Sequence, residues 1–141
     1  MSDCVFCSIA ADRAPAYRVY EDQRTLAFLD VNPAAQGHTL VVPKEHAESI
    51  ADMRPPLVGD VFRTVQRVAV ALESVIEADG TSVVQSNGRA AGQDVFHAHV
   101  HVVPRYEDDA VDLGWRGGDS DDAVLTDVAD TLREESSTLQ R

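Results

Sequence analysis

Five histidines are the residues of this 141-residue chain whose type and spacing point most directly to chemistry. His97, His99 and His101 alternate with apolar residues, while His38 and His46 lie on either side of an apolar run that ends at Pro43. Side chains on a strand alternate between its faces, so a strand over residues 95–103 is predicted to project the three histidines together. The intervening residues are predicted to face the core: Phe96, Ala98, Val100 and Val102.

A row of imidazoles permits three kinds of chemistry. An imidazole is substantially unprotonated at neutral pH, so it can attack phosphorus directly and form a covalent phosphoramidate intermediate. Two histidines in an HxH pattern can instead hold a catalytic transition metal, although no carboxylate base lies between His97 and Pro104. The third possibility is ligand binding without turnover.

The only two cysteines, Cys4 and Cys7, form a CxxC motif at the N-terminus. No basic region or long apolar run precedes or follows them, so we expect a cytoplasmic protein without a membrane-spanning segment. In a reducing compartment, CxxC favours metal binding or redox chemistry over a structural disulfide. A redox role is less well supported, because no thioredoxin-like βαβ pattern surrounds the motif.

The charge balance is strongly acidic, with 24 acids against 12 bases and a net charge of −12. General attraction to nucleic acid or to anionic membrane surfaces is therefore excluded as the basis of function. The segment Glu107–Arg141 holds 11 of the acids and only 3 bases, and it can be a solvated surface or an arm that binds a partner. A lysine-poor, acidic surface is also similar to proteins of salt-loving organisms, in which salt screens the self-repulsion.

The hydrophobic pattern predicts one α+β unit: an antiparallel sheet of about five strands, with one long helix packed on it and a C-terminal helix. Helices are expected over Cys4–Ala11 (capped by Ser2 or Asp3), Leu57–Ala78 and residues 122–135. Strands are expected over Tyr17–Glu21, Thr25–Leu29, residues 38–42, Ser82–Gln85 and Val95–Val103.

Several motifs together resemble those of the histidine triad (HIT) nucleotide hydrolases and transferases, in particular a prokaryotic branch with an N-terminal CxxC. The resemblance covers roughly residues 4–106, and these are the stretches that carry it: Phe28–Val31, Gly37–His46, Asn87 and Gly92–Arg105. It implies a catalytic domain over residues 1–106, with the acidic segment 107–141 packed on the same domain.

The resemblance also implies a role for each site residue. His99 would be the nucleophile that attacks the α-phosphorus, His101 would neutralise phosphate oxygens, and His97 and His38 would orient His99. The remaining residues would bind the nucleotide: Asp30 at the ribose, Asn87 and Gln93 at ribose and phosphate, and Phe6, Ile9, Phe28 and Val31 at the base. By their sequence pattern alone, these four apolar residues could equally be core, and Asp30 and Asn87 could be turn residues.

The resemblance further implies partners and a metal. The substrate would be a purine nucleotide in the form of a phosphoramidate or dinucleoside polyphosphate. A structural zinc ion would be held by Cys4, Cys7, His46 and His97, with no organic cofactor, and a homodimer would form through the helix Leu57–Ala78 and the strand after Gly80. The alternatives remain a regulatory nucleotide-binding module and an HxH metal-dependent hydrolase.

Two further residues, Asp94 and Trp115, bear on the predicted active site. Many relatives carry serine or threonine after the glutamine, where this chain has Asp94. An ionised carboxylate there would repel phosphate, so the leaving group is an open question. Trp115, in the acidic segment, is a candidate contact of the active site.

Overall fold

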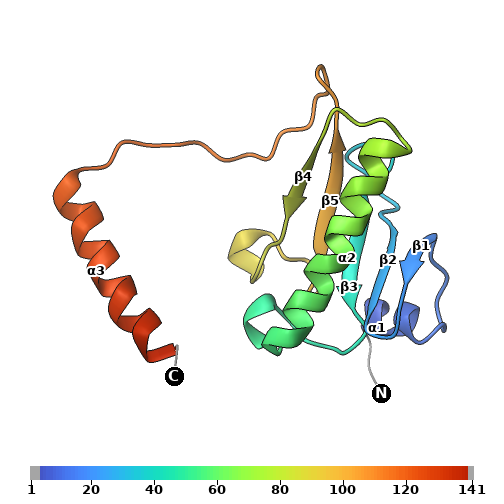
Figure 1. The fold of residues 1–141 in the computed structure, drawn as a ribbon, viewed down its shortest axis with the longest axis horizontal. Helices are drawn as coiled ribbons and strands as arrows, with labels where there is room; N and C mark the ends of the chain where they lie inside the picture. Colours follow the sequence, from blue (N-terminus) through green and yellow to red (C-terminus); the bar gives the residue numbers. More distant parts are fainter. Residues whose placement is uncertain (1–3, 140–141) are drawn as a thin grey trace. The chain divides into compact units, whose positions relative to one another are not determined.

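The computed structural model describes residues 4–139, which divide into two compact units, the first ending at Val111 and the second beginning at Asp112. The first unit is a five-stranded antiparallel sheet in the order β1-β2-β3-β5-β4 with helices packed on it, which confirms the predicted α+β fold (Figure 1). Its elements are α1 Val5–Ala10, β1 Arg18–Glu21, β2 Thr25–Leu29, β3 Thr39–Pro43, α2 Pro55–Ser74, β4 Gly80–Val84 and β5 Val100–Arg105, with short 3₁₀ turns at Ile50–Asp52 and Arg89–Ala91.

Alternation along the central strands gives the sheet two apolar faces, each covered by one helix. On one face α2 buries its stripe against β2, β3 and β5, and the core there contains Leu57, Val61, Val65, Val68 and Leu72 with Ala27, Val41, Val100 and Val102. On the other face α1 covers Leu26, Phe28, Leu40 and Val42 with Phe6 and Ile9. The helix α1 is only six residues long, so part of this second face is left for a pocket.

The long helix ends earlier than its apolar pattern predicts. It begins at Pro55 in its first turn, where the missing proline N–H costs nothing, and it ends at Ser74 rather than Ala78. Val75 and Ile76 continue the apolar run but are exposed, and Glu77 has a left-handed φ of 63° that turns the chain toward β4. The helix was therefore predicted to be too long at its C-terminal end, because apolar residues continue the pattern after the helix has ended.

The strand that carries the histidines is shorter than predicted, because β5 begins at Val100 and not at Val95. Its partner β3 ends at Pro43, which has no N–H to donate, and the Pro43 carbonyl accepts a hydrogen bond from His97 Nε2 at 2.8 Å. Ladder pairing thus stops at Val41 and Val100. Ala98 still reaches the core on the α2 face, as predicted. The prediction that Phe96 faces the core was wrong, because its side chain is half-buried and lies beneath the Arg89 guanidinium.

The N-terminal cap of α1 also differs from the prediction. Cys4 is the cap, and its Sγ accepts a hydrogen bond from the Cys7 N–H at 3.3 Å. Ser2 and Asp3, the predicted caps, lie outside the described residues. The CxxC spacing therefore serves helix initiation as well as any ligand role, since it places one sulfur at the cap and the other one turn later.

The second unit contains α3, Asp122–Leu139, which confirms the predicted C-terminal helix. Asp121 precedes it, and its carboxylate accepts a hydrogen bond from the Val124 N–H at 3.1 Å. The predicted apolar side of this helix is exposed: Val124, Leu125, Val128 and Leu132. Packing of this segment on the first unit stays a prediction. Among the described residues, no helix has the length and apolarity needed to cross a membrane.

Candidate active site

The histidine row lies on the α1 face of the sheet, at the end of β5. His97 and His99 are buried in the extended segment before the strand, and His101 lies on β5 opposite Leu40 of β3. His38 precedes β3 and is also buried. The imidazole rings of His99 and His101 are 5.2 Å apart between centroids, and those of His38 and His101 are 5.1 Å apart. The structure thus brings together four of the predicted catalytic residues.

The protonation of His99 is fixed by a main-chain carbonyl. His99 Nδ1 lies 2.7 Å from the carbonyl oxygen of His97, and a carbonyl can only accept, so Nδ1 carries the proton. The neutral ring then has its lone pair on Nε2. The ring is held from the side by Phe6, whose centroid lies 5.2 Å away in an edge contact. This arrangement leaves an oriented nucleophilic nitrogen.

A second chain of hydrogen bonds fixes His38 and His101. The Ala34 N–H donates to His38 Nδ1 at 2.9 Å, so His38 carries its proton on Nε2 and donates it to His101 Nδ1 at 2.9 Å. His101 must then carry its proton on Nε2, where it can donate to a bound oxygen. The Asp30 carboxylate lies 3.5 Å from His38 Nε2 and supports the same orientation.

Burial keeps these two imidazoles neutral. Removal from water lowers the pKa of His38, and the Asp30 charge only partly opposes this. Burial also lowers the pKa of His101, with further lowering from its neighbours His99 and His38, against the opposing charges of Asp30 and Asp94. The two neutral rings, each in a fixed tautomer, therefore form a series of hydrogen bonds in which every donor points toward the pocket end at His101, and they add no net charge to the site.

A pocket of about 360 Å³ opens beside the row, within the size range of small-ligand sites. It contains most of the predicted nucleotide-binding residues, together with the predicted catalytic residues His99 and His101; the nucleotide-binding ones are Phe6, Ile9, Phe28, Asp30 and Val31. Phe6 and Phe28 meet edge to face with ring centroids 5.5 Å apart, and Val31 is 73% exposed at the rim. The pocket therefore joins an apolar slot to the face of the histidines.

Asp94, which the sequence singled out, also lines the pocket, whereas these further residues were not anticipated: Val5, Pro15, Ala16, Leu29, Asn32, Leu40 and Val95. Leu40 could have been found from strand alternation, since it is two residues from His38 and faces the same side. Pro15 and Ala16 lie in the loop before β1, and no sequence pattern predicted where this loop lies relative to the sheet.

The two predicted amide residues lie elsewhere. Gln93 is buried, and its side chain closes the turn before the triad by accepting from the Gly88 N–H at 2.7 Å and donating to the carbonyls of Glu48 and Val95. Asn87 accepts from the Ile50 N–H at 2.7 Å and pairs with Gln85. Neither belongs to the pocket wall as the structure describes it, so phosphate or ribose contact by these amides stays a prediction.

Both cysteines and two histidines converge on one point beside the pocket. Cys4, Cys7, His46 and His97 each bring one ligand atom into a group whose members lie within 4.8 Å of one another. His97 Nδ1 lies 3.3 Å from Cys4 Sγ, 3.5 Å from Cys7 Sγ and 3.2 Å from His46 Nδ1. These are about the separations expected between the ligands of one tetrahedral zinc ion, and two thiolates with two imidazoles are a typical structural set.

His97 connects this cluster to the nucleophile. Its Nε2 donates to the Pro43 carbonyl, so the lone pair of the neutral ring is on Nδ1, facing the cysteines. Burial lowers the pKa of His97, which favours the neutral ring that a metal requires. The carbonyl of the same residue accepts the His99 proton. One residue thus belongs to the ligand cluster by its side chain and to the catalytic row by its main chain.

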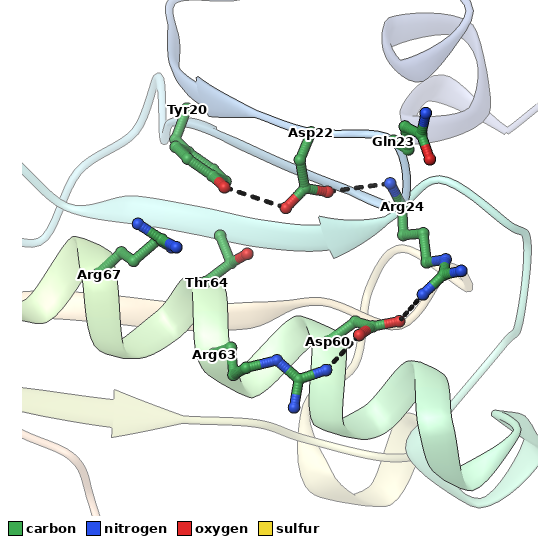
Figure 2. A pocket seen from close by; sticks show the side chains of 8 residues that line it. All are labelled: Tyr20, Asp22, Gln23, Arg24, Asp60, Arg63, Thr64 and Arg67. Carbon is green, nitrogen blue, oxygen red and sulfur yellow. Dashed lines mark hydrogen bonds and ion pairs between the residues drawn. The ribbon is translucent and has the colours of Figure 1, made fainter.

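A second cavity, of about 320 Å³, lies between the β1–β2 turn and α2. Figure 2 shows Arg24 and Arg63 pointing toward one carboxylate, that of Asp60. Arg67 lies over the Tyr20 ring, with 5.4 Å from its guanidinium carbon to the ring centroid. The lining includes no histidine or cysteine, and much of its positive charge is neutralised within the cavity. The histidine pocket is therefore the candidate active site.

Comparison with known proteins identifies a family. The model of the family described as the HIT domain matches residues 11–108. An uncharacterized HIT-like protein of Borreliella burgdorferi is 42% identical over 120 residues, which are 84% of this chain and 85% of that protein. Adenylylsulfatase HINT3 of Arabidopsis thaliana is 36% identical over 110 residues, 78% of this chain but 56% of that protein.

Solved structures give the same result. The structure of SMU.412c from Streptococcus mutans has a TM-score of 0.91 at 41% identity, covering 96% of this chain and 86% of that one. A histidine triad nucleotide-binding protein from Candida albicans has a TM-score of 0.87 at 29% identity, covering 97% and 99%. A zinc-bound histidine triad family protein from Mycobacterium smegmatis has a TM-score of 0.74 at 39% identity, covering 96% and 97%. The chain belongs to the HIT family.

Proposed function

We propose that this protein hydrolyses or transfers nucleotides from phosphoramidates or dinucleoside polyphosphates through a covalent nucleotidyl-His99 intermediate. The observation that carries the proposal is the His99 ring in the pocket wall, with its proton fixed on Nδ1 by the His97 carbonyl at 2.7 Å. A nucleophile must present a lone pair, and here the lone pair is on Nε2 without any need for a general base. The names of the Candida albicans and Arabidopsis thaliana relatives support a nucleotide as the bound group.

The pocket residues would bind the nucleotide in three parts. A purine base would lie in the apolar slot lined by Phe6 and Phe28, the ribose hydroxyls would donate to Asp30, and an α-phosphate oxygen would accept from His101 Nε2. Phosphoryl transfer depends mainly on positioning and on neutralising charge at the phosphorus. The hydrogen-bonded chain from Ala34 through His38 to His101 supplies a donor whose direction is already set.

The reaction would take two steps. His99 Nε2 attacks the α-phosphorus and forms an N–P bond, while the bond from phosphorus to the leaving group breaks. The leaving group keeps the electron pair of that bond and takes a proton from solvent. Water then attacks the same phosphorus, the N–P bond breaks, and the water proton returns to solvent. The products are a nucleoside monophosphate and His99 in its starting tautomer.

We also propose that Cys4, Cys7, His46 and His97 hold one structural zinc ion, as the ligand distances and the zinc-bound Mycobacterium smegmatis relative support. Such an ion would fix α1 to the segment before β5. Metal analysis should find one zinc per chain in the purified protein, and none in a Cys4→Ser, Cys7→Ser double variant. Metal-free wild type that is fully folded would overturn this assignment.

A homodimer through α2 and β4 is part of the proposal. Strand β4 is an edge of the sheet, and exposed apolar side chains lie on and after α2: Phe62, Val70, Val75 and Ile76. Both features favour association of a second chain. Sedimentation should give the mass of two chains, and a Val70→Asp, Val75→Asp variant should give the mass of one.

The function is tested by incubating the protein with adenosine phosphoramidate and with diadenosine polyphosphates, with and without a chelator, alongside His99→Ala. The proposal predicts turnover that the substitution lowers by at least about a thousandfold and that removal of exchangeable metal does not change. Binding without turnover would favour a regulatory module. Loss with chelator while the fold stays intact would favour a metal-dependent hydrolase. A second set of possible ligand atoms, one each from Asp30, His38 and His101, also lies within 4.8 Å.

A further inference from the structure

The pocket contains a carboxylate that the proposed mechanism does not use. Asp94 lies in the pocket wall with His99 and His101, is exposed, and makes no hydrogen bond or ion pair with any described residue. Asp30, the other pocket carboxylate, differs, because it accepts the Asn32 N–H at 2.8 Å and lies beside His38. The Asp94 charge nevertheless acts within the site, since it opposes the burial that lowers the pKa of His101.

The pocket also has no cationic side chain of its own. Its ionisable residues are Asp30, Asp94, His99 and His101, and none of its described residues is an arginine or a lysine. Burial of His101 holds that ring neutral. A leaving group with several negative charges, such as a nucleoside polyphosphate, would therefore meet a carboxylate and no fixed positive charge.

In the proposed binding mode, the leaving group would occupy the part of the pocket that includes the uncommitted carboxylate of Asp94. In-line displacement expels it on the side of phosphorus opposite His99 Nε2. The base and ribose occupy the apolar slot and Asp30 in the proposed mode, so the rest of the pocket remains for the leaving group. The only charged side chain left there is that of Asp94.

We propose that Asp94 determines the leaving group, and that the preferred substrates are nucleotides joined through the α-phosphate to an amine that bears a second, positively charged group. This inference rests on the proposed function, and it names the substrate class of the same site. The P–N bond breaks as His99 forms its bond to phosphorus, and the amine departs with the electron pair of that bond and a proton taken from solvent. The Asp94 carboxylate attracts the distant ammonium of that amine before and during departure.

Three adenosine phosphoramidates with the same P–N bond provide the test. The amine is putrescine, which is cationic at its far end, pentylamine, which is its neutral counterpart of equal length, or γ-aminobutyrate, which is anionic. Wild type is expected to show a kcat/KM about five- to tenfold higher for the putrescine compound than for the pentylamine compound, as one partly screened charge pair would give. The γ-aminobutyrate compound should be the poorest substrate. Molar KCl should reduce the preference.

Asp94→Asn keeps the shape of the side chain and removes its charge. It should bring the putrescine to pentylamine ratio to about one and improve use of the γ-aminobutyrate compound several-fold. Asp108→Asn is the matched control, because Asp108 is an exposed aspartate outside the pocket and its loss changes the net charge equally. An unchanged ratio in Asp94→Asn, or an equal change in Asp108→Asn, would overturn the inference.

Binding separates this inference from the proposed function. In a His99→Ala background, calorimetry gives dissociation constants for the same three compounds, so charge preference is measured without catalysis. If no compound is turned over by wild type but the preference and its loss in Asp94→Asn persist in binding, the hydrolase proposal fails and the role of Asp94 stands. If turnover occurs with no preference in rate or binding, the role of Asp94 fails and the hydrolase proposal stands.

Discussion

At the scale of single residues, the chemistry of the site depends on which ring nitrogen carries each proton. Three main-chain groups decide this: the carbonyls of His97 and Pro43 and the N–H of Ala34. The spacing of the histidines predicted that they would gather, and they do. Their tautomers could not be predicted, because each depends on a main-chain group whose position only the folded chain sets. Gln93 shows the same limit, since three main-chain groups of other residues hold its side-chain amide.

The buried imidazoles should make stability depend on pH. Burial lowers the pKa of His38 below its unfolded value of about 6.5, so the unfolded chain binds more protons in the interval between the two values. The free energy of unfolding should therefore be highest above about pH 6.5 and fall as the pH decreases through and below that value. Urea unfolding at about pH 7.5, 6.5 and 5.5 measures this slope. His38→Asn should show a shallower slope than wild type, and an equal slope would contradict the assignment.

At the scale of elements, the site is positioned where strand pairing stops. Alternation and helical periodicity predicted the sheet, α2 and α3, but several boundaries were shifted, and two of these shifts have local reasons. Strand β5 starts at Val100 because Pro43 ends its partner, and α2 ends at Ser74 although Val75 and Ile76 are apolar. Gly37 shows a constraint of the same kind: it has a φ of 104°, and a Cβ there would lie 3.2 Å from the side chains of Leu72 and Ile76. The residue before His38 thus has to be small.

The packing of α2 on the sheet should provide much of the stability. Leu57 is 2% exposed within the larger core, so Leu57→Ala should lower the free energy of unfolding by about 3 kcal/mol through lost burial and the cavity it leaves. Val19→Ala, on β1 outside the proposed dimer interface and 48% exposed, should change it by less than about 0.5 kcal/mol. Chemical denaturation of both variants measures the difference. Similar losses would show that α2 does not pack as described.

At the scale of the whole molecule, most of the net negative charge and the residues of the candidate active site lie in different parts of the sequence. The chain has a net charge of −12, yet the proposed ligand is an anion, and the two agree because the phosphate would be bound by neutral imidazoles. Much of the acidic excess lies after residue 106, and Asp112–Arg141 form a unit of their own. The amino-acid composition therefore predicted that the surface repels nucleic acid and anionic membranes, but it could not predict which ligand the pocket binds. Trp115, 83% exposed in the second unit, stays only a candidate contact.

Self-repulsion of the acidic surface should be relieved by salt. The Debye length falls from about 10 Å at 0.1 M to about 3 Å at 1 M, so distant carboxylates cease to repel one another. We expect the Tm to rise by several degrees between low salt and molar KCl, as for proteins adapted to salt. Calorimetry with sorbitol of matched osmolality as the control separates screening from a general solute effect. A Tm that does not rise in KCl would reject this hypothesis.

The most direct test of the central claim is to locate the covalent intermediate. Wild type is mixed with adenosine phosphoramidate, quenched with acid-free denaturant within the first turnover, and analysed by mass spectrometry with fragmentation of the peptide that contains all three triad histidines. The account predicts one adenylyl group per chain, on His99, and no adduct in His99→Ala. An adduct on another residue, or full turnover by His99→Ala, would contradict it.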